Sequence, residues 1–269
     1  MNGQTTISYR AQCVDLLEER IKQNITSQQI DLIEWIFKNV SIVEDSKILE
    51  LCCGTGSQTI QFLSKVGENG QVVALDVSKE ALLKLQNKTP AAWRDRLTLI
   101  ESNIDDVNTA LNRENLAKPY FDVIFSAYGL YYSKDPTVIL NDILQWLKPD
   151  GRIVIVGPYG PNNEQLFSFL QKSFVKIPDF VKYTSSDFMC SAVIPWLSFK
   201  FSDISIHTVV NRVAWKDKTD VLVYWKNTTF YDNDKLTAVD RQLDGHFINN
   251  ETFINEKWIM LIEAYNEKR

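Results

Sequence analysis

The sequence predicts an α/β fold in which helices cover both faces of a mostly parallel sheet. Short apolar runs suited to buried strands alternate with segments of helical spacing over the first 156 residues. The first run, Lys47–Leu51, leads into a turn that carries Gly54 and Gly56, and a helix is expected from about Gln58. Glycines let the backbone approach a ligand closely, and the start of a helix offers free N–H groups. The stretch 47–59 is therefore typical of a nucleotide-binding strand, turn and helix.

Two helices are predicted before this unit. Apolar residues recur at helical spacing over Tyr9–Ile21 and again over Gln28–Val40. Ser27 stands directly before the second segment, where a side chain that caps a helix N-terminus is expected.

An acidic residue closes the second predicted strand, Gln71–Asp76. It lies twenty residues after Gly56, about where nucleotide-binding folds place a carboxylate that accepts hydrogen bonds from a ribose. Asp76 is therefore the ribose-binding candidate. The alternative is that Asp76 caps the helix that follows, Lys79–Asn87.

The alternation of strands and helices continues to residue 156. Pro149 and Gly151 predict a turn at 148–151, because Pro cannot continue a helix and Gly adopts the left-handed conformation. Asp105 and Asp106 follow the third strand, where solvated or helix-capping roles compete with a metal site, and we predict no metal. The remaining elements of this half are strands Leu97–Glu101, Phe121–Ala127 and Arg152–Val156 and a helix Val138–Leu147.

The second half of the chain interrupts this rhythm. A segment rich in turns and aromatic residues extends from Gly157 to Lys200 and contains a predicted helix, Glu164–Lys176. Further along we expect strands Ile204–Val210 and Trp258–Tyr265 and helices Asp217–Phe230 and Leu236–Leu243.

Composition and charge limit the classes of protein to consider. The chain has 269 residues, of which 45% are hydrophobic, enough for one large core or for one core with an appended cap. The net charge is −5 and Lys and Arg are not clustered, so we expect no nucleic-acid partner. Met1–Arg10 has neither a basic nor an apolar region of the kind found in secretory leaders, so we expect none, and no apolar window approaches about 18 residues. We therefore expect a cytoplasmic protein with no membrane partner.

The glycine-rich turn distinguishes between nucleotide ligands. A dinucleotide fingerprint requires a third glycine where Thr59 stands, and a phosphate-binding loop requires Lys where Ser57 stands. The stretch instead resembles the first motif of the class I S-adenosylmethionine-dependent methyltransferases, an acid followed by x-x-x-Gly-x-Gly. The matching residues are Glu50, Gly54, Thr55 and Gly56, and Cys52 stands where that family commonly has another glycine.

This resemblance implies a Rossmann-like three-layer α/β sandwich. Its seven-stranded, mostly parallel sheet would have the order 3-2-1-4-5-7-6, with the seventh strand antiparallel. In this family an N-terminal helical segment, here 1–40, often closes the cofactor cleft. The methyltransferase domain would then be 41–269, with a helical cap inserted at about 158–200.

The resemblance also implies S-adenosyl-L-methionine as the cofactor. After the third strand, Asn103 and Ile104 stand at the positions whose residues contact the adenine in this family. The side-chain oxygen of Asn can accept a hydrogen bond from the adenine amino group. The cofactor-binding candidates are Tyr9, Glu50, Cys52, Gly54, Thr55, Gly56, Asp76, Val77, Asn103, Ile104 and Ser126.

The loop after the fourth strand, 128–136, resembles that of ubiquinone- and biotin-pathway-type small-molecule methyltransferases. Tyr131 stands where His is common there. In such enzymes the methyl group passes to a small organic acceptor by direct in-line displacement, for which proximity and exclusion of water suffice and a base is optional. The candidates for accepting or steering a proton are Tyr131, Tyr132 and His207, and His246 is a further possible base.

Three functions compete at this stage. The first is a small-molecule methyltransferase with a role in biosynthesis. The second is a protein that binds S-adenosylmethionine without catalysis. The third is an NAD-dependent oxidoreductase, which the missing third glycine disfavours. The acceptor, its reacting atom (O, N, C or S) and the oligomeric state are left open.

Overall fold

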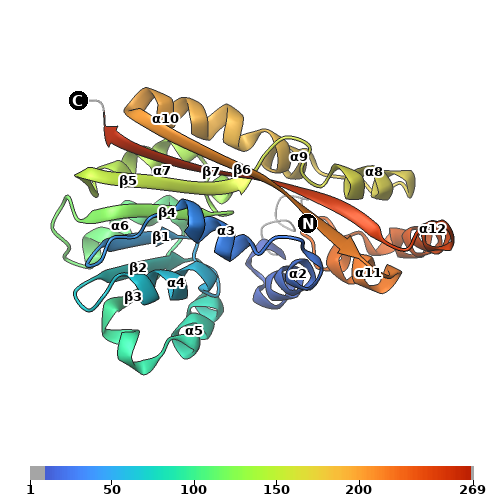
Figure 1. Ribbon diagram of the computed structural model, residues 1–269, viewed down its shortest axis with the longest axis horizontal. Coiled ribbons are helices and arrows are strands. Elements are labelled where there is room, and N and C mark those ends of the chain that lie inside the picture. The colour runs from blue at the N-terminus through green and yellow to red at the C-terminus, as the bar shows by residue number, and fades with distance from the viewer. Residues whose placement is uncertain (1–9, 268–269) are drawn as a thin grey trace. The chain divides into compact units, whose positions relative to one another are not determined.

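The computed structural model of the protein describes residues 10–267, which form two compact units (Figure 1). The sheet unit contains residues 33–157, 188–208 and 260–267. The helical unit contains residues 10–32, 158–187 and 209–259. The predicted boundaries at residue 40 and at about 158–200 stay a prediction.

The seven strands form one sheet with the order 3-2-1-4-5-7-6, and the seventh strand is antiparallel, as predicted. Its strands are β1 (Lys47–Leu51), β2 (Gln71–Asp76), β3 (Leu97–Glu101), β4 (Phe121–Ala127), β5 (Leu147–Pro158), β6 (Phe201–Trp215) and β7 (Phe253–Glu267). Strands β1 to β4 have the predicted bounds. β1, β2 and β4 are largely buried, and such strands read as continuous apolar runs, whereas β3 is an edge strand with Ile100 buried.

The register places the ends of three strands together. Leu51, the last residue of β1, pairs with Leu75 of β2 on one side and with Ser126 of β4 on the other. The strand order reverses around β1, and in open α/β sheets ligands bind outside the carboxyl ends of strands at this point. The turns after β1, β2 and β4 are therefore the first place to look for a site.

Helices of the sheet unit are fixed by caps and by a buried core. Ser78 and Asp135 accept hydrogen bonds from backbone N–H groups at the starts of α5 and α7. Phe62 of α4 packs edge-on against Phe37 and Phe125, with ring centroids about 5 Å apart. The helices are α3 (Leu32–Asn39), α4 (Ser57–Lys65), α5 (Lys79–Lys88), α6 (Val107–Arg113), α7 (Pro136–Leu144) and α10 (Ile194–Lys200), with a π-helix at Met189–Val193.

The predicted turn at 148–151 lies inside β5. Leu147 pairs with Phe121 and Arg152 pairs with Val123, so four residues of β5 stand opposite a single residue of β4. The four residues bulge out of the ladder, which agrees with their turn chemistry.

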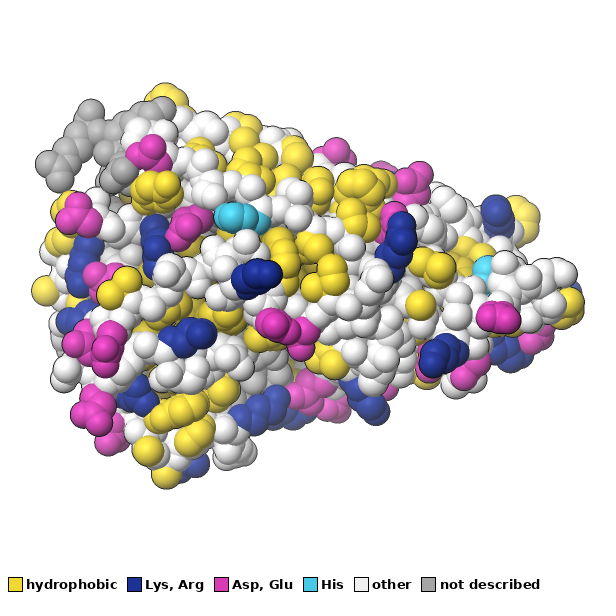
Figure 2. Space-filling view, in the orientation of Figure 1, with side chains coloured by type: hydrophobic (Ala, Val, Ile, Leu, Met, Phe, Trp, Pro, Cys, Tyr) yellow, Lys and Arg dark blue, Asp and Glu magenta, His cyan; other side chains and the backbone are white. Residues whose placement is uncertain are grey.

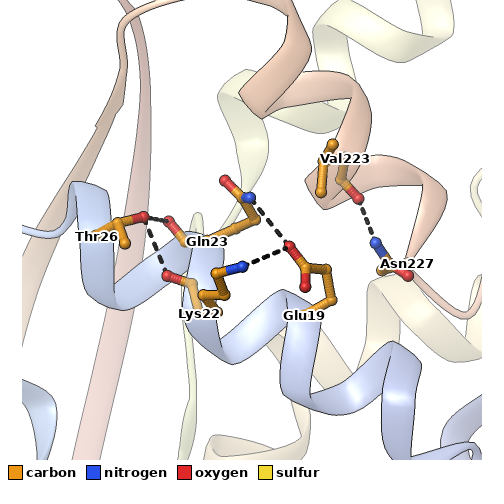
Figure 3. A network of polar contacts seen from close by, with 6 residues as sticks. All are labelled: Glu19, Lys22, Gln23, Thr26, Val223 and Asn227. Carbon is orange, nitrogen blue, oxygen red and sulfur yellow. Dashed lines mark hydrogen bonds and ion pairs between the residues drawn. The ribbon is translucent and has the colours of Figure 1, made fainter.

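The helical unit has a separate core, in which Trp215 and Trp225 are fully buried. Its helices are α2 (Val14–Ser27), α8 (Glu164–Lys172), α9 (Asp179–Ser186), α11 (Lys218–Lys226) and α12 (Leu236–Asn249). Figure 3 shows α2 beside α11. Along α2, Gln23 donates to Glu19 at 3.3 Å and Thr26 Oγ1 donates to the Lys22 carbonyl at 3.1 Å, which are bonds between neighbouring turns of one helix.

The predicted N-terminal helices have different bounds in the structure. Ser27 ends α2 and does not cap the next helix, because residues 28–30 are not helical: Gln28 is extended, and the chain bends at residues 29 and 30. Gln28 forms a β-bridge with Val213, and the Asn211 side chain bonds both the N–H and the carbonyl of Ile30 at 3.0 and 2.7 Å. These bonds to a distant strand replace the helical bonds that the local pattern favours.

Three later elements are longer than predicted. β6 and β7 each have fifteen residues. Helix α12 continues to Asn249, beyond the predicted end at Leu243, and therefore includes His246. Its ring packs against Phe253, with centroids 5.1 Å apart, and this contact favours the extra helical turn.

On the face shown in Figure 2, acidic and basic side chains are interspersed. Across residues 10–267, the helices are too short or too polar to span a bilayer.

Candidate active site

The turn after β1 is built from left-handed residues. Cys52, Gly54 and Gly56 have φ values of 56°, 54° and 81°. A β-carbon on Gly56 would lie 2.2 Å from Leu85 Cδ1 of α5, so both conformation and space require glycine there. Within the described part of the chain no side chain caps α4, which begins at Ser57, so its first N–H groups face the turn uncapped.

Asp76 ties the end of β2 to this turn. One carboxylate oxygen accepts from Gly54 N at 2.7 Å and the other accepts from Ser78 N at 2.9 Å. Burial raises the pKa of Asp76, and the backbone bonds, including one from Val77, oppose that shift. The side chain that caps α5 is Ser78, which accepts from Ala81 N, so the cap alternative does not account for Asp76.

Glu50 is a buried carboxyl group directly behind the turn. Only 2% of its surface is exposed, and Thr59 Oγ1 donates to its Oε2 at 2.5 Å. Burial raises the pKa of Glu50 to about 8, which the Thr59 bond opposes and the charge of Asp76 reinforces. At neutral pH the carboxyl group is therefore mostly protonated. In the sequence, Thr59 stood out only as the residue in place of a third glycine, although a hydroxyl in the first turn of the helix was a signal for this partner.

Asn103 and Ile104 follow β3, as predicted. Asn103 is exposed, and its Oδ1 accepts from Asp105 N at 3.0 Å. The oxygen keeps a second lone pair, so the predicted hydrogen bond from the adenine amino group stays a prediction. Ile104 is buried.

The Asp105 carboxylate links the loops after β3 and β4. It accepts from Lys134 N at 2.9 Å and lies 3.9 Å from Lys134 Nζ. Among residues 10–267, no group of three or more His, Cys, Asp and Glu side chains is arranged to hold a metal ion.

The ends of β1 and β4 meet at Cys52, Ser126 and Gly129. A β-carbon on Gly129 would lie 2.3 Å from Cys52 Cβ and 3.5 Å from Ser126 Oγ. Ser126 is 3% exposed, and its hydroxyl has no hydrogen-bond partner among the described residues. Burial raises the pKa of Cys52, and the charges of Asp76, Glu50 and Asp105 add to the shift, so the thiol stays protonated. An unpaired hydroxyl at this depth is a group that a ligand can satisfy.

Tyr131 and Tyr132 lie in the short helical turn Leu130–Tyr132 after β4. Their ring centroids are 4.8 Å apart, and Tyr131 also meets Phe188 edge-on at 5.7 Å. Tyr132 is 42% exposed, whereas Phe188 is buried. The structure therefore brings both predicted tyrosines to the same sheet edge as the glycine-rich turn.

His207 does not join this group. It lies in β6, which is separated from β1 by β4, β5 and β7, or roughly 19 Å at the usual strand spacing. Its Nε2 is 3.1 Å from Ser205 Oγ.

Tyr9 lies outside the described residues. The roles of all the predicted site residues stay predictions.

The arrangement fits an adenosyl ligand with a charged tail. α4 presents its N–H groups, Val77 is exposed beside the Asp76 carboxylate, and the Ser126 hydroxyl has no hydrogen-bond partner among the described residues.

Residues 42–221 match the protein family described as "Methyltransferase domain". The chain belongs to this methyltransferase family. The predicted family is thereby confirmed, and S-adenosylmethionine is the cofactor that membership implies.

Curated relatives agree with this family. A demethylmenaquinone methyltransferase of Lactococcus lactis is 31% identical over 172 residues, which are 59% of this chain and 65% of that protein. The one of Shouchella clausii is 29% identical over 147 residues, 52% of this chain and 58% of that protein. The chain thus spans less than two thirds of the length of these relatives.

Solved structures share the fold. The YcgJ protein from Bacillus subtilis superposes with a TM-score of 0.60 at 14% identity, covering 88% of this chain and 98% of that one. A SAM-dependent methyltransferase from Aquifex aeolicus gives 0.50 at 14% identity, covering 87% and 88%. At such identities the likeness concerns the fold alone.

Proposed function

We propose that the protein transfers the methyl group of S-adenosylmethionine to a small organic acceptor, and that the acceptor is a planar ring of the quinone or phenol class. One observation carries the proposal: the Asp76 carboxylate is bonded to Gly54 N, which joins the acid at the end of β2 to the glycine turn after β1. The tyrosines of the neighbouring loop supply flat apolar faces for a ring. Relatives named as demethylmenaquinone and 2-phytyl-1,4-naphtoquinone methyltransferases support the ring class.

In this proposal the backbone holds the cofactor. The uncapped N–H groups of α4 face the carboxylate of the methionine portion, and Asp76 accepts from the ribose. Asn103 and Ile104 contact the base. The sulfonium supplies a methyl group with a neutral leaving group, so the protein's task is to align the acceptor and exclude water.

The tyrosines act on the acceptor. If the acceptor atom is a hydroxyl oxygen, Tyr131 or Tyr132 accepts or steers the proton that leaves it. Glu50 is buried behind the turn and protonated at neutral pH, so it is not assigned that task.

Calorimetric titration with S-adenosylhomocysteine tests the cofactor site. The wild-type protein is expected to bind, and Asp76→Ala to bind at least tenfold more weakly, because a charged acceptor is lost. Asp150→Ala, at an exposed acid of the β5 bulge, is the matched control and should bind as the wild type does. Absence of heat with the wild-type protein, or equal binding by Asp76→Ala, contradicts the proposal.

A second assay separates catalysis from binding alone. Incubation with S-adenosylmethionine and a quinol or phenol should release S-adenosylhomocysteine in proportion to the acceptor. Binding without any acceptor-dependent release would favour a non-catalytic protein, and binding of NAD in place of the sulfonium would favour an oxidoreductase.

A further inference from the structure

The turn after α8 carries an aromatic residue at a position where glycine is usual. Helix α8 ends in a Schellman motif, in which Val175 N donates to the Leu170 carbonyl at 3.2 Å and Phe174 N donates to the Gln171 carbonyl at 2.9 Å. Phe174 follows the C-cap residue Ser173 and has a φ of 60°. This position prefers glycine, because a β-carbon is strained in the left-handed conformation.

The fold does not account for the choice of Phe174 at this position. Its side chain is 83% exposed, so burial of the ring offsets little of the backbone strain. Among the described residues, the other non-glycine residues with a left-handed φ are Asp and Asn, which tolerate it, or Cys52 and Tyr128, which border the candidate active site. Strained residues of this kind are retained at functional sites, and Phe174 therefore marks a second one.

Two basic residues flank Phe174. Lys172 and Lys176 are both exposed, and residues 165–178 contain no Asp or Glu. The next acid along the chain, Asp179, forms an ion pair with Lys182 at 3.7 Å. This turn is therefore locally positive in a chain whose net charge is −5.

Helix α12 lies beside the end of α8 (Figure 1). The hydroxyl of Ser173 donates to the side-chain oxygen of Gln242, which joins the two helices. The acids Asp240 and Asp244 of α12 both form ion pairs with Lys218, at 3.1 and 2.6 Å. The neighbouring carboxylates are thus already paired with a cation, and the turn keeps its positive character.

A single protruding ring with basic neighbours suits a bilayer surface better than a second protein. Ser173 and Val175, on either side of Phe174, are only 4% and 2% exposed, so the ring stands out alone from the turn. A specific protein interface needs a broad complementary surface of about 800 Å² on each partner. A bilayer needs no complementary shape: an aromatic ring enters the headgroup region, and Lys ammonium groups stay with anionic headgroups.

We infer that residues 172–176 bind the surface of an anionic bilayer, with the Phe174 ring inserted at the level of the headgroups and Lys172 and Lys176 beside the lipid charges. The expectation of no membrane partner rested on the lack of a spanning segment, and a surface contact requires none. One ring and two cations give weak, reversible binding that salt reduces. The inference concerns the helical unit and does not rest on the proposed methyl transfer.

Co-sedimentation with lipid vesicles tests the binding. The wild-type protein should bind vesicles of phosphatidylcholine with roughly 30% phosphatidylglycerol, and binding should fall about fivefold or more on neutral vesicles or in about 0.5 M salt. Lys172→Glu combined with Lys176→Glu should cause a similar loss. Lys38→Glu combined with Lys65→Glu, at exposed positions of the sheet unit, changes the net charge equally and should leave binding unchanged.

Phe174→Gly separates binding from folding, because the two should change in opposite directions. Glycine removes the backbone strain, so the melting temperature should rise by about 2–4 °C, while vesicle binding should fall about fivefold or more. Phe199→Ala is the matched control, since that ring is 74% exposed on α10 and its loss should not alter binding.

Three outcomes overturn the inference. The first is a wild-type protein that does not bind anionic vesicles. The second is a Phe174→Gly variant that binds them as the wild type does. The third is equal loss of binding in the Lys38→Glu, Lys65→Glu control, which would show that net charge and not this turn governs the contact.

Discussion

The turn after β1 and the loop after β4 meet at the same sheet edge but are held by different forces. Hydrogen bonds to and from the backbone define the turn: the Asp76 carboxylate accepts from Gly54 N, and Cys53 N donates to the Leu75 carbonyl at 3.0 Å. Ring contacts hold the loop, where Tyr131 packs on Tyr132 and Phe188. Apart from the Asp76 carboxylate, the bonds of the turn do not depend on side-chain identity, whereas ring packing does. This difference supports the proposal that the turn binds the cofactor and that the loop contacts the acceptor.

The strongest test of the turn is Gly56→Ala. The methyl group meets Leu85 at 2.2 Å, and the residue must keep a φ of 81°, so we expect the free energy of unfolding to fall by about 2–4 kcal/mol and cofactor binding to be lost. Urea denaturation and calorimetry measure these effects. Gly245→Ala is the control, because nothing lies within 4 Å and a helical Ala should raise stability by about 0.5–1 kcal/mol. Equal effects at the two glycines would contradict the argument that conformation and space require glycine at position 56.

Gly129→Ala tests whether turn and loop are coupled. The new methyl group meets Cys52 Cβ at 2.3 Å, and we expect a loss of about 1–3 kcal/mol in unfolding free energy. Cys52→Gly removes that side chain, so the double variant should recover most of the loss. A double-mutant cycle by urea denaturation gives the coupling, and additive effects would show that the two segments are independent.

The loop is tested by Tyr131→Phe and Tyr132→Phe. Removing the hydroxyl that handles the proton should lower turnover about tenfold or more while cofactor affinity stays unchanged. Initial rates at saturating acceptor, together with calorimetry, separate these quantities. If neither variant loses turnover, neither tyrosine hydroxyl takes part in proton transfer, and the two rings contribute only to binding the acceptor.

A further test of the turn concerns Glu50 and pH. Its pKa is about 8 in the folded protein against a usual value of 4.5, so the unfolded state loses this proton first as pH rises. The contribution of Glu50 to stability is therefore fully present below pH 4.5 and declines toward pH 8, by an amount on the order of a few kcal/mol.

Glu50→Gln cannot titrate and should flatten that decline. We would measure the free energy of unfolding of both proteins by urea denaturation at several pH values between 5 and 8. The two pKa values of Glu50 set this range. Parallel curves for the two proteins would refute the raised pKa.

Much of the site follows from local pattern, but its internal contacts do not. The spacing of Glu50, Gly54, Gly56 and Asp76 is a property of the chain, and the structure places all four at one sheet edge. The bond from Thr59 to Glu50 depends on how α4 packs on β1. The unpaired Ser126 hydroxyl and the contact between Cys52 and Gly129 depend on the pairing of β1 with β4. No spacing rule reports such contacts.

The sequence by itself determined strands β1 to β4, the glycine turn, the acid that follows β2 and the methyltransferase family, because each is written in neighbouring residues. Only the tertiary structure decided that residues 28–30 are not helical, that β6 and β7 reach fifteen residues, and that the 148–151 turn is a bulge within β5. The physical reason is range. Asn211 bonds Ile30 across 181 positions, and hydrogen bonds between such distant residues override local preference without leaving a local signal.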